Sequence, residues 1–248
     1  MIIKRFCLLL SIILISCARD VKQLPKKPNV LFILVDDLGW KDLGCYGSSF
    51  YETPNIDLLA SQSYRFTNAY SSNPVCSPTR ASIMTGKHPS RIGITDWIPA
   101  ENPPSELWNK LRQNQKLVQP KNKYALPLEE FTMAEALKTA GYPTFYAGKW
   151  HLGDEGFFPQ DQGFQINKGG HIKGSPPGGY YTPYNNPQLE DGPEGEYLTD
   201  RLTDESIAFM DQNKENPFFL YLAFYTVHTP IQPNLKYLQK FKNNYKAL

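Results

Sequence analysis

The apolar residues of this chain fall into short runs, separated by polar stretches rich in glycine and proline. Two continuous apolar runs, residues 29–35 (NVLFILV) and 217–227 (PFFLYLAFYTV), are rich in β-branched and aromatic side chains. Such runs are typical of strands that are buried on both faces of a sheet. Shorter apolar runs at residues 64–70 and 143–147 predict two further short strands.

Helical signals lie between these runs. Pro54 and Pro78 suit the first turn of a helix, Thr132 is a good N-cap, and Gly141 can end the helix that follows. The helices expected from these signals and from apolar spacing cover residues 53–61, 78–85, 132–138 and 203–213. Residues 92–126, with Trp97 and Trp108, and residues 152–198 carry no regular pattern and predict long structured loops.

The alternation of strands and helices predicts an α/β fold, with a mostly parallel or mixed sheet flanked by helices. In such sheets, ligands bind beyond the carboxyl ends of the strands. Asp36, Asp37, Lys149, His151 and His228 each follow a predicted strand closely. These charged and titratable residues should therefore meet at one edge of the sheet.

The first residues predict an export signal rather than part of the fold. Residues 1–17 (MIIKRFCLLLSIILISC) join a short basic region to an apolar run too short to span a bilayer. The residues before Cys17 resemble a bacterial lipobox, which predicts a lipid on Cys17 and attachment to a membrane facing the periplasm or the cell surface. An ordinary signal peptide with an incidental cysteine is the alternative. Polar residues 18–28 would form a tether, and residues 29–248 the folded domain.

Net charge argues against a nucleic-acid partner. Without Lys4 and Arg5 of the signal, the 248-residue chain has 24 basic and 24 acidic residues. Nucleic-acid binders depend on an excess of Lys and Arg that neutralises phosphates.

Asp36 and Asp37 are adjacent carboxylates where a buried strand ends. Their mutual repulsion indicates a bound cation, and hard oxygen ligands favour Ca²⁺ or Mg²⁺. The alternative is a solvated pair of aspartates in a turn.

Cys76 lies two residues before Pro78, and Arg80 lies one turn into the same predicted helix. A helix N-terminus and a guanidinium group favour an anion such as a sulfate or phosphate ester. In an oxidising compartment, a disulfide between Cys45 and Cys76 is the alternative.

Lys149 and His151 are separated by one residue, so in an extended segment both side chains would point the same way. A cation beside an imidazole suits charge neutralisation and proton transfer. A surface lysine and a structural histidine are the alternative. His171 lies in the glycine- and proline-rich stretch that follows.

Three motifs together resemble a known enzyme family. Residues 76–87 (CSPTRASIMTGK) are similar to the first sulfatase signature, and residues 141–151 (GYPTFYAGKWH) to the second. The opening residues 29–39 (NVLFILVDDLG) are also typical of these proteins. The chain thus resembles type I sulfatases of the alkaline-phosphatase-like superfamily, in particular the arylsulfatase and N-acetylgalactosamine-6-sulfatase-like branch.

The resemblance implies a sulfuric ester hydrolase that acts on sulfated carbohydrates or aryl sulfates. Cys76 would be converted to formylglycine by a formylglycine-generating enzyme or an anaerobic sulfatase-maturing enzyme. The hydrated aldehyde would then attack the sulfur of the ester. Asp36, Asp37 and residue 76 would bind Ca²⁺, with Mg²⁺ as the second candidate.

The same resemblance assigns the remaining roles. Arg80 would support the nucleophile, Lys149 would bind the sulfate, and His151 would accept a proton. His228 would protonate the leaving alcohol. His171 or Ser175 would line the substrate side.

One part of the family pattern is missing. The family also uses an Asp-Asn metal pair and a further lysine later in the chain, and no Asp-Asn pair occurs in this sequence. We therefore expect an N-terminal sulfatase fragment. Two alternatives are a lipid-anchored remnant that binds sulfated glycans without catalysis and a phosphoester hydrolase on the same scaffold. Cysteine at position 76 argues against the second.

Overall fold

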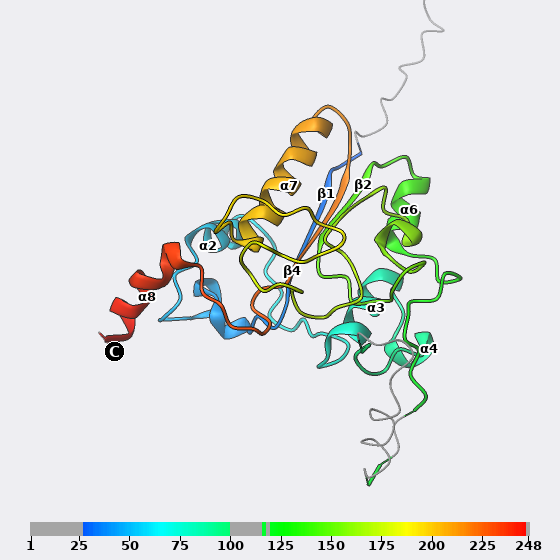
Figure 1. The fold of residues 1–248 in the computed structure, drawn as a ribbon, viewed down its shortest axis with the longest axis horizontal. Coiled ribbons are helices and arrows are strands. Elements are labelled where there is room, and N and C mark those ends of the chain that lie inside the picture. The colour runs from blue at the N-terminus through cyan, green and yellow to red at the C-terminus, as the bar shows by residue number, and fades with distance from the viewer. Residues whose placement is uncertain (1–26, 100–115, 118–119, 247–248) are drawn as a thin grey trace, which may run out of the picture.

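The computed structural model describes residues 27–99, 116–117 and 120–246, and these build a parallel sheet with helices on both sides (Figure 1). Its four strands lie in the order β1-β4-β2-β3. They span Val30–Val35 (β1), Thr144–Gly148 (β2), Ile166–Lys168 (β3) and Phe219–Phe224 (β4). All described strand pairs are parallel, which confirms the predicted α/β class.

The two central strands are buried because each face of the sheet has its own apolar core. Phe145 and Leu222 point into a core with helix α7 (Leu198–Asn213). Tyr146 and Tyr221 point to the opposite face, where they pack with residues of helices α3 (Cys76–Thr85) and α6 (Met133–Thr139). Alternate side chains of β2 and β4 therefore enter different cores, which explains their continuous apolar sequences.

Most predicted helices are present with shifted ends. Thr132 caps α6 through a capping box with Glu135, as its sequence indicates. Helix α3 begins at Cys76, before Pro78, and α7 begins at Leu198, before the predicted start at residue 203. The remaining helices are α2 (Pro54–Ser61), α4 (Pro89–Ile92) and α8 (Leu235–Lys246), with 3₁₀ turns at Trp40–Asp42, Gly44–Tyr46 and Pro159–Gln162.

Three sequence predictions about strands are wrong. Residues 64–70 form no strand, and Tyr64 is 96% exposed because no neighbouring strand pairs with this segment. Strand β1 is not buried on both faces: Leu31 and Ile33 are about half exposed. In the part of the chain that the structure describes, β1 pairs only with β4 and is an edge of the sheet. The short strand β3 lies inside the predicted loop 152–198.

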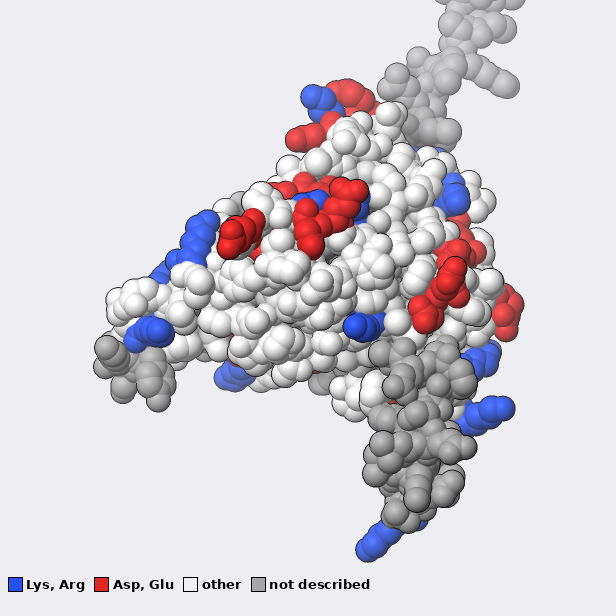
Figure 2. Space-filling view, viewed as in Figure 1, with Lys and Arg blue, Asp and Glu red and all other residues white. Residues whose placement is uncertain are grey.

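Several sequence predictions lie outside the described residues, including the signal at 1–17, most of the tether at 18–28, and Trp108. No helix among the described residues is long and apolar enough to cross a bilayer. On the face seen in Figure 2, acidic side chains gather in groups, whereas most lysines and arginines stand apart near the edges.

Candidate active site

The carboxyl ends of β1, β2 and β4 bring the predicted residues to one edge of the sheet. Val35 pairs with Phe224, and Gly148 pairs with Ala223, so Asp36 and Lys149 leave the sheet at nearly the same level. A Cβ atom on Gly148, whose φ is 100°, would lie 1.9 Å from the carbonyl oxygen of Ala223. Glycine is therefore needed where β2 turns into the site.

Asp36 forms the centre of a buried ion cluster. One carboxylate oxygen lies 3.1 Å from Nη2 of Arg80, and the other accepts a hydrogen bond from the Lys149 ammonium group. All three side chains are at most 8% exposed. Burial by itself would raise the pKa of Asp36, but the Arg80 and Lys149 cations outweigh it and hold that pKa below its usual value. Asp36 is therefore a carboxylate near neutral pH.

Arg80 and Lys149 are also fixed to each other. Arg80 donates to the backbone oxygen of Lys149, which also accepts a hydrogen bond from the Tyr146 hydroxyl group. The Lys149 side chain is fully buried, and the Asp36 carboxylate compensates the burial of its charge.

Cys76 is the first residue of α3, and its sulfur lies 3.2 Å from Nζ of Lys149. The thiol is half-buried and free, as is that of Cys45, so the disulfide alternative is not realised. The first backbone N–H groups of α3 and the Lys149 cation both favour negative charge at this position. An anionic substrate is thus favoured beside Cys76.

The metal-binding prediction can be compared with the donor atoms present. Asp36, Cys76 and His228 each place one potential ligand atom within 4.8 Å of the others. Asp37, with a φ of 57°, is 57% exposed, and its Oδ2 lies 4.0 Å from Nε2 of His228. Asp36, Asp37 and Cys76 line one pocket, but Asp37 is not in the group of close donor atoms, which contains a single carboxylate.

His151 is buried and neutral. Its Nε2–H donates to the backbone oxygen of Ile98 at 2.7 Å, while Nδ1 has no hydrogen-bond partner among the described residues. Burial, followed by the nearby Lys149 charge, lowers the pKa of His151 to about 3. His151 has a φ of 59°, so the segment from Lys149 to His151 is not extended and the condition considered for a shared direction of the two side chains is not met. Lys149 nevertheless lies beside Cys76, and His151 lines the same pocket as Cys76.

Two pockets meet at Cys76. The smaller, of about 240 Å³, includes Asp36, Asp37 and Arg80 in its lining. The larger, of about 550 Å³, includes His151 and His228. A group at position 76 therefore faces the carboxylates on one side and an open cavity on the other.

His171 does not line either pocket, although its sequence position predicts a substrate contact. It is buried, and its backbone oxygen accepts a hydrogen bond from the backbone N–H of His151 at 3.1 Å. Lys173 and Ser175 line the larger pocket instead, together with Trp97. Lys173 and Trp97 belong to no sequence motif. The sequence predicts only that each lies in a long structured loop.

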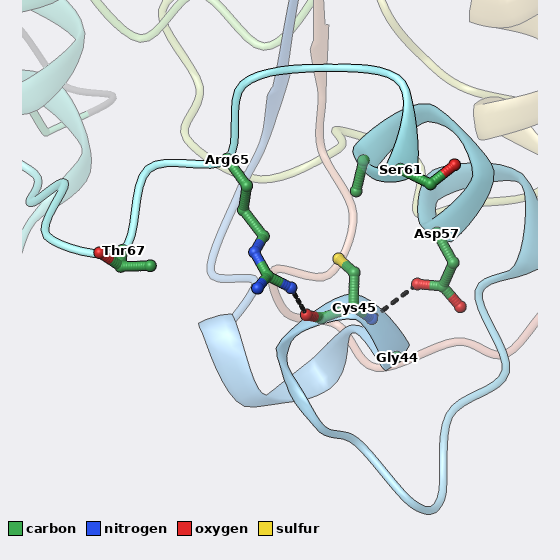
Figure 3. A pocket seen from close by; sticks show the side chains of 7 residues that line it. Gly44, Cys45, Asp57, Ser61, Arg65 and Thr67 are labelled. Carbon is green, nitrogen blue, oxygen red and sulfur yellow. Dashed lines mark hydrogen bonds between the residues drawn. The ribbon is translucent and has the colours of Figure 1, made fainter.

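A third hollow of about 650 Å³ is lined by residues of α2 and the 3₁₀ turn at Gly44–Tyr46 (Figure 3). There, Asp57 accepts the backbone N–H of Cys45, and Arg65 donates to the Cys45 carbonyl oxygen. None of the predicted catalytic residues lines this hollow.

The family model described as Sulfatase matches residues 28–248. The chain belongs to the sulfatase family. It is 34% identical over 240 residues to N-acetylgalactosamine-6-sulfatase from Homo sapiens, covering 86% of this chain and 42% of that protein. It is also 34% identical over 226 residues to an arylsulfatase from Hemicentrotus pulcherrimus, covering 83% of this chain and 38% of that protein.

A solved structure shows the same fold. The crystal structure of Ps i-CgsB in complex with k-i-k-neocarrahexaose superposes with a TM-score of 0.70 and 31% identity, covering 88% of this chain and 49% of that one. The alkaline-phosphatase-like fold predicted from the motifs is therefore confirmed. The chain spans about half, or less, of the length of these relatives.

Proposed function

We propose that this protein hydrolyses sulfate esters of carbohydrates, with residue 76 as the nucleophile after conversion of Cys76 to formylglycine. The observation that carries the proposal is the position of Cys76: at the start of α3, 3.2 Å from Lys149, where two pockets meet. The names of the matched relatives support sulfate esters as the class of substrate. The saccharide bound to Ps i-CgsB supports a carbohydrate.

Two groups would complete the site. Formylglycine at position 76 would supply a hydrated aldehyde as the nucleophile, and its formation requires a formylglycine-generating or anaerobic sulfatase-maturing enzyme as a partner. A Ca²⁺ ion, or Mg²⁺, held by Asp36, Asp37 and residue 76 would supply positive charge that polarises the sulfate oxygens.

The chain's own residues would bind and orient the ester. The Lys149 ammonium group pairs with a sulfate oxygen beside position 76, while Arg80 holds the Asp36 carboxylate in place. His151 would accept a proton by resemblance to the family, although its neutral Nδ1 atom, without a hydrogen-bond partner among the described residues, is buried against Gly174.

His228 would protonate the leaving alcohol. Its Nδ1 lies 2.9 Å from the backbone oxygen of Thr229, which can only accept, so Nδ1 carries a proton. The Nε2 atom is on the side of Asp37, and the residue lines the larger pocket. With Nδ1 protonated, His228 can act as the acid only as the imidazolium, which carries a second proton on Nε2 and can pass it to the oxygen of a departing sugar.

Expression with a sulfatase-maturing enzyme tests this function. Purified protein should release sulfate from an aryl sulfate faster than phosphate from the matching aryl phosphate, and intact-mass analysis should show an aldehyde at residue 76. Cys76→Ala should abolish release, whereas Cys45→Ala, at the other free cysteine of the folded part, should leave it unchanged. An unmodified Cys76 thiol in such a host would contradict the mechanism. An aldehyde without turnover would favour the alternative of a glycan-binding remnant.

We also propose that Cys17 carries a lipid and attaches the exported protein to a bacterial membrane. The support is the lipobox-like sequence before Cys17. Cys17→Ser should move the protein from the membrane fraction to the soluble periplasmic fraction, while Cys7→Ser should not. A Cys17→Ser protein that stays at the membrane would contradict lipidation.

A further inference from the structure

The wall of the larger pocket is built around His151. On one side, the backbone oxygen of Ile98 accepts from the His151 imidazole, and the Ile98 N–H donates to the Ser77 hydroxyl group at 3.1 Å. Trp97, next to Ile98, is 37% exposed and lines the pocket. The backbone next to Trp97 is therefore held to both His151 and the residue that follows Cys76.

The opposite side is a loop that packs on the same imidazole. The backbone N–H of His151 donates to His171, and the N–H of Lys173 lies 3.4 Å from Nδ1 of His171. A Cβ atom on Gly174 would lie 2.5 to 2.9 Å from three ring atoms of His151, so the glycine backbone lies directly against the ring. Lys173 and Ser175, on either side of Gly174, are thereby placed on the pocket wall.

The charge of this pocket favours an anion. Among the residues that the structure describes, its lining includes the Lys173 cation and no Asp or Glu. Lys173 is exposed, and no ion pair is recorded for it among the described residues. The Lys149 cation beside Cys76 already provides a partner for the ester sulfate, so Lys173 is a second, separate cation.

We infer that Trp97 and Lys173 form a saccharide subsite, in which Lys173 selects sugars that carry a second anionic group besides the ester to be cleaved. The inference rests on the proposed function, because the reacting sulfate is placed at residue 76. The indole offers an apolar face for a sugar ring, and the flexible ammonium group reaches a sulfate or carboxylate on that ring. A pocket of about 550 Å³ is large enough for a monosaccharide unit.

Direct binding measurements test the subsite independently of turnover. The probes are N-acetylgalactosamine 6-sulfate and N-acetylgalactosamine 4,6-disulfate, titrated by calorimetry or NMR. The unaltered chain should bind the disulfate about fivefold more tightly, the size expected for one exposed ion pair. Lys173→Gln should remove this preference and leave the affinity for the monosulfate unchanged, while Lys173→Arg should keep most of it. Lys214→Gln, at an exposed lysine on another surface, is the matched control.

Trp97→Ala should lower the affinity for both sugars by a similar factor, because both would make the same contact with the indole ring. Equal affinity of the unaltered chain for the two probes, equal losses in Lys173→Gln, or no binding of either probe would overturn the subsite. Failure of the proposed function has a different signature: a Cys76 thiol and no sulfate release, with the preference for the disulfate intact.

Discussion

The Asp36 carboxylate and the Lys149 ammonium group form an ion pair inside the protein, although 113 positions separate them in the chain. The pair exists because β1 and β2 both lie parallel to β4 and end at the same level. Lys149 is also the cation 3.2 Å from the Cys76 sulfur. One lysine thus joins the predicted metal ligand to the predicted nucleophile.

Loss of this lysine should be costly. Lys149→Met removes one of the two cations that compensate the buried Asp36 carboxylate, so we expect a loss of about 3–5 kcal/mol in the free energy of unfolding. Lys87→Met breaks the more exposed pair with Glu130 and should cost at most about 1 kcal/mol. Urea denaturation of the two variants measures the difference. Similar losses would mean that the Asp36–Lys149 pair contributes no more than a surface ion pair.

Strand ends were the most informative part of the sequence. Asp36, Lys149 and His228 could be placed together in advance because each follows an apolar run, and parallel strands bring such positions to one edge. The exposed face of β1 could not be anticipated, since an apolar run does not show which neighbours are present to cover it. Lys173 was missed because its place depends on Gly174 packing against His151, a contact between distant segments.

Calcium binding by this chain should be weak and specific. Both oxygens of Asp36 already accept from Arg80 and Lys149, so a metal ion must compete with these cations for the carboxylate. We expect a dissociation constant of about 10⁻⁴–10⁻³ M, the range of the weak calcium sites of extracellular modules. Calorimetric titration with Ca²⁺ should show heat that disappears in Asp37→Asn and persists in Asp154→Asn, at an exposed aspartate outside the site. Submicromolar binding, or binding unaffected by Asp37→Asn, would contradict this arrangement.

Acid should destabilise the fold through two buried histidines. Burial, and then Lys173, lowers the pKa of His171 to about 4, partly offset by Asp154, and the pKa of His151 is about 3. The unfolded chain takes up these protons near pH 6.5, whereas the folded chain resists them. Stability is therefore full above pH 6.5 and falls as the pH drops toward 4 for His171 and toward 3 for His151.

Each pKa unit between the folded and unfolded values changes the free energy of unfolding by about 1.4 kcal/mol. Asp36, whose folded pKa lies below 3.8, adds its own loss only at lower pH. We expect the free energy of unfolding, measured in urea, to fall less between pH 7.5 and pH 4.5 in His171→Gln than in the unaltered chain. His88→Gln, at an exposed histidine, should show the same fall in the free energy of unfolding as the unaltered chain. A pH dependence that His171→Gln does not reduce would show that His171 is not held neutral.

The contact between Gly174 and His151 should make Gly174→Ala disruptive. The added Cβ atom would lie 2.5 Å from Cε1 of the imidazole, which cannot retreat without losing its hydrogen bond to Ile98. The loop must shift instead, at a cost of about 1–3 kcal/mol, the range for overpacking a filled site. Because Lys173 moves with this loop, the preference for the disulfated probe should fall as well. Ser175→Ala changes the same loop without adding an atom against the ring. It should retain stability and the ratio of the two affinities, because the hydroxyl group that it removes from the pocket wall is available to both sugars. If the two variants behave alike in urea unfolding and in sugar binding, the loop is not positioned by its contact with His151.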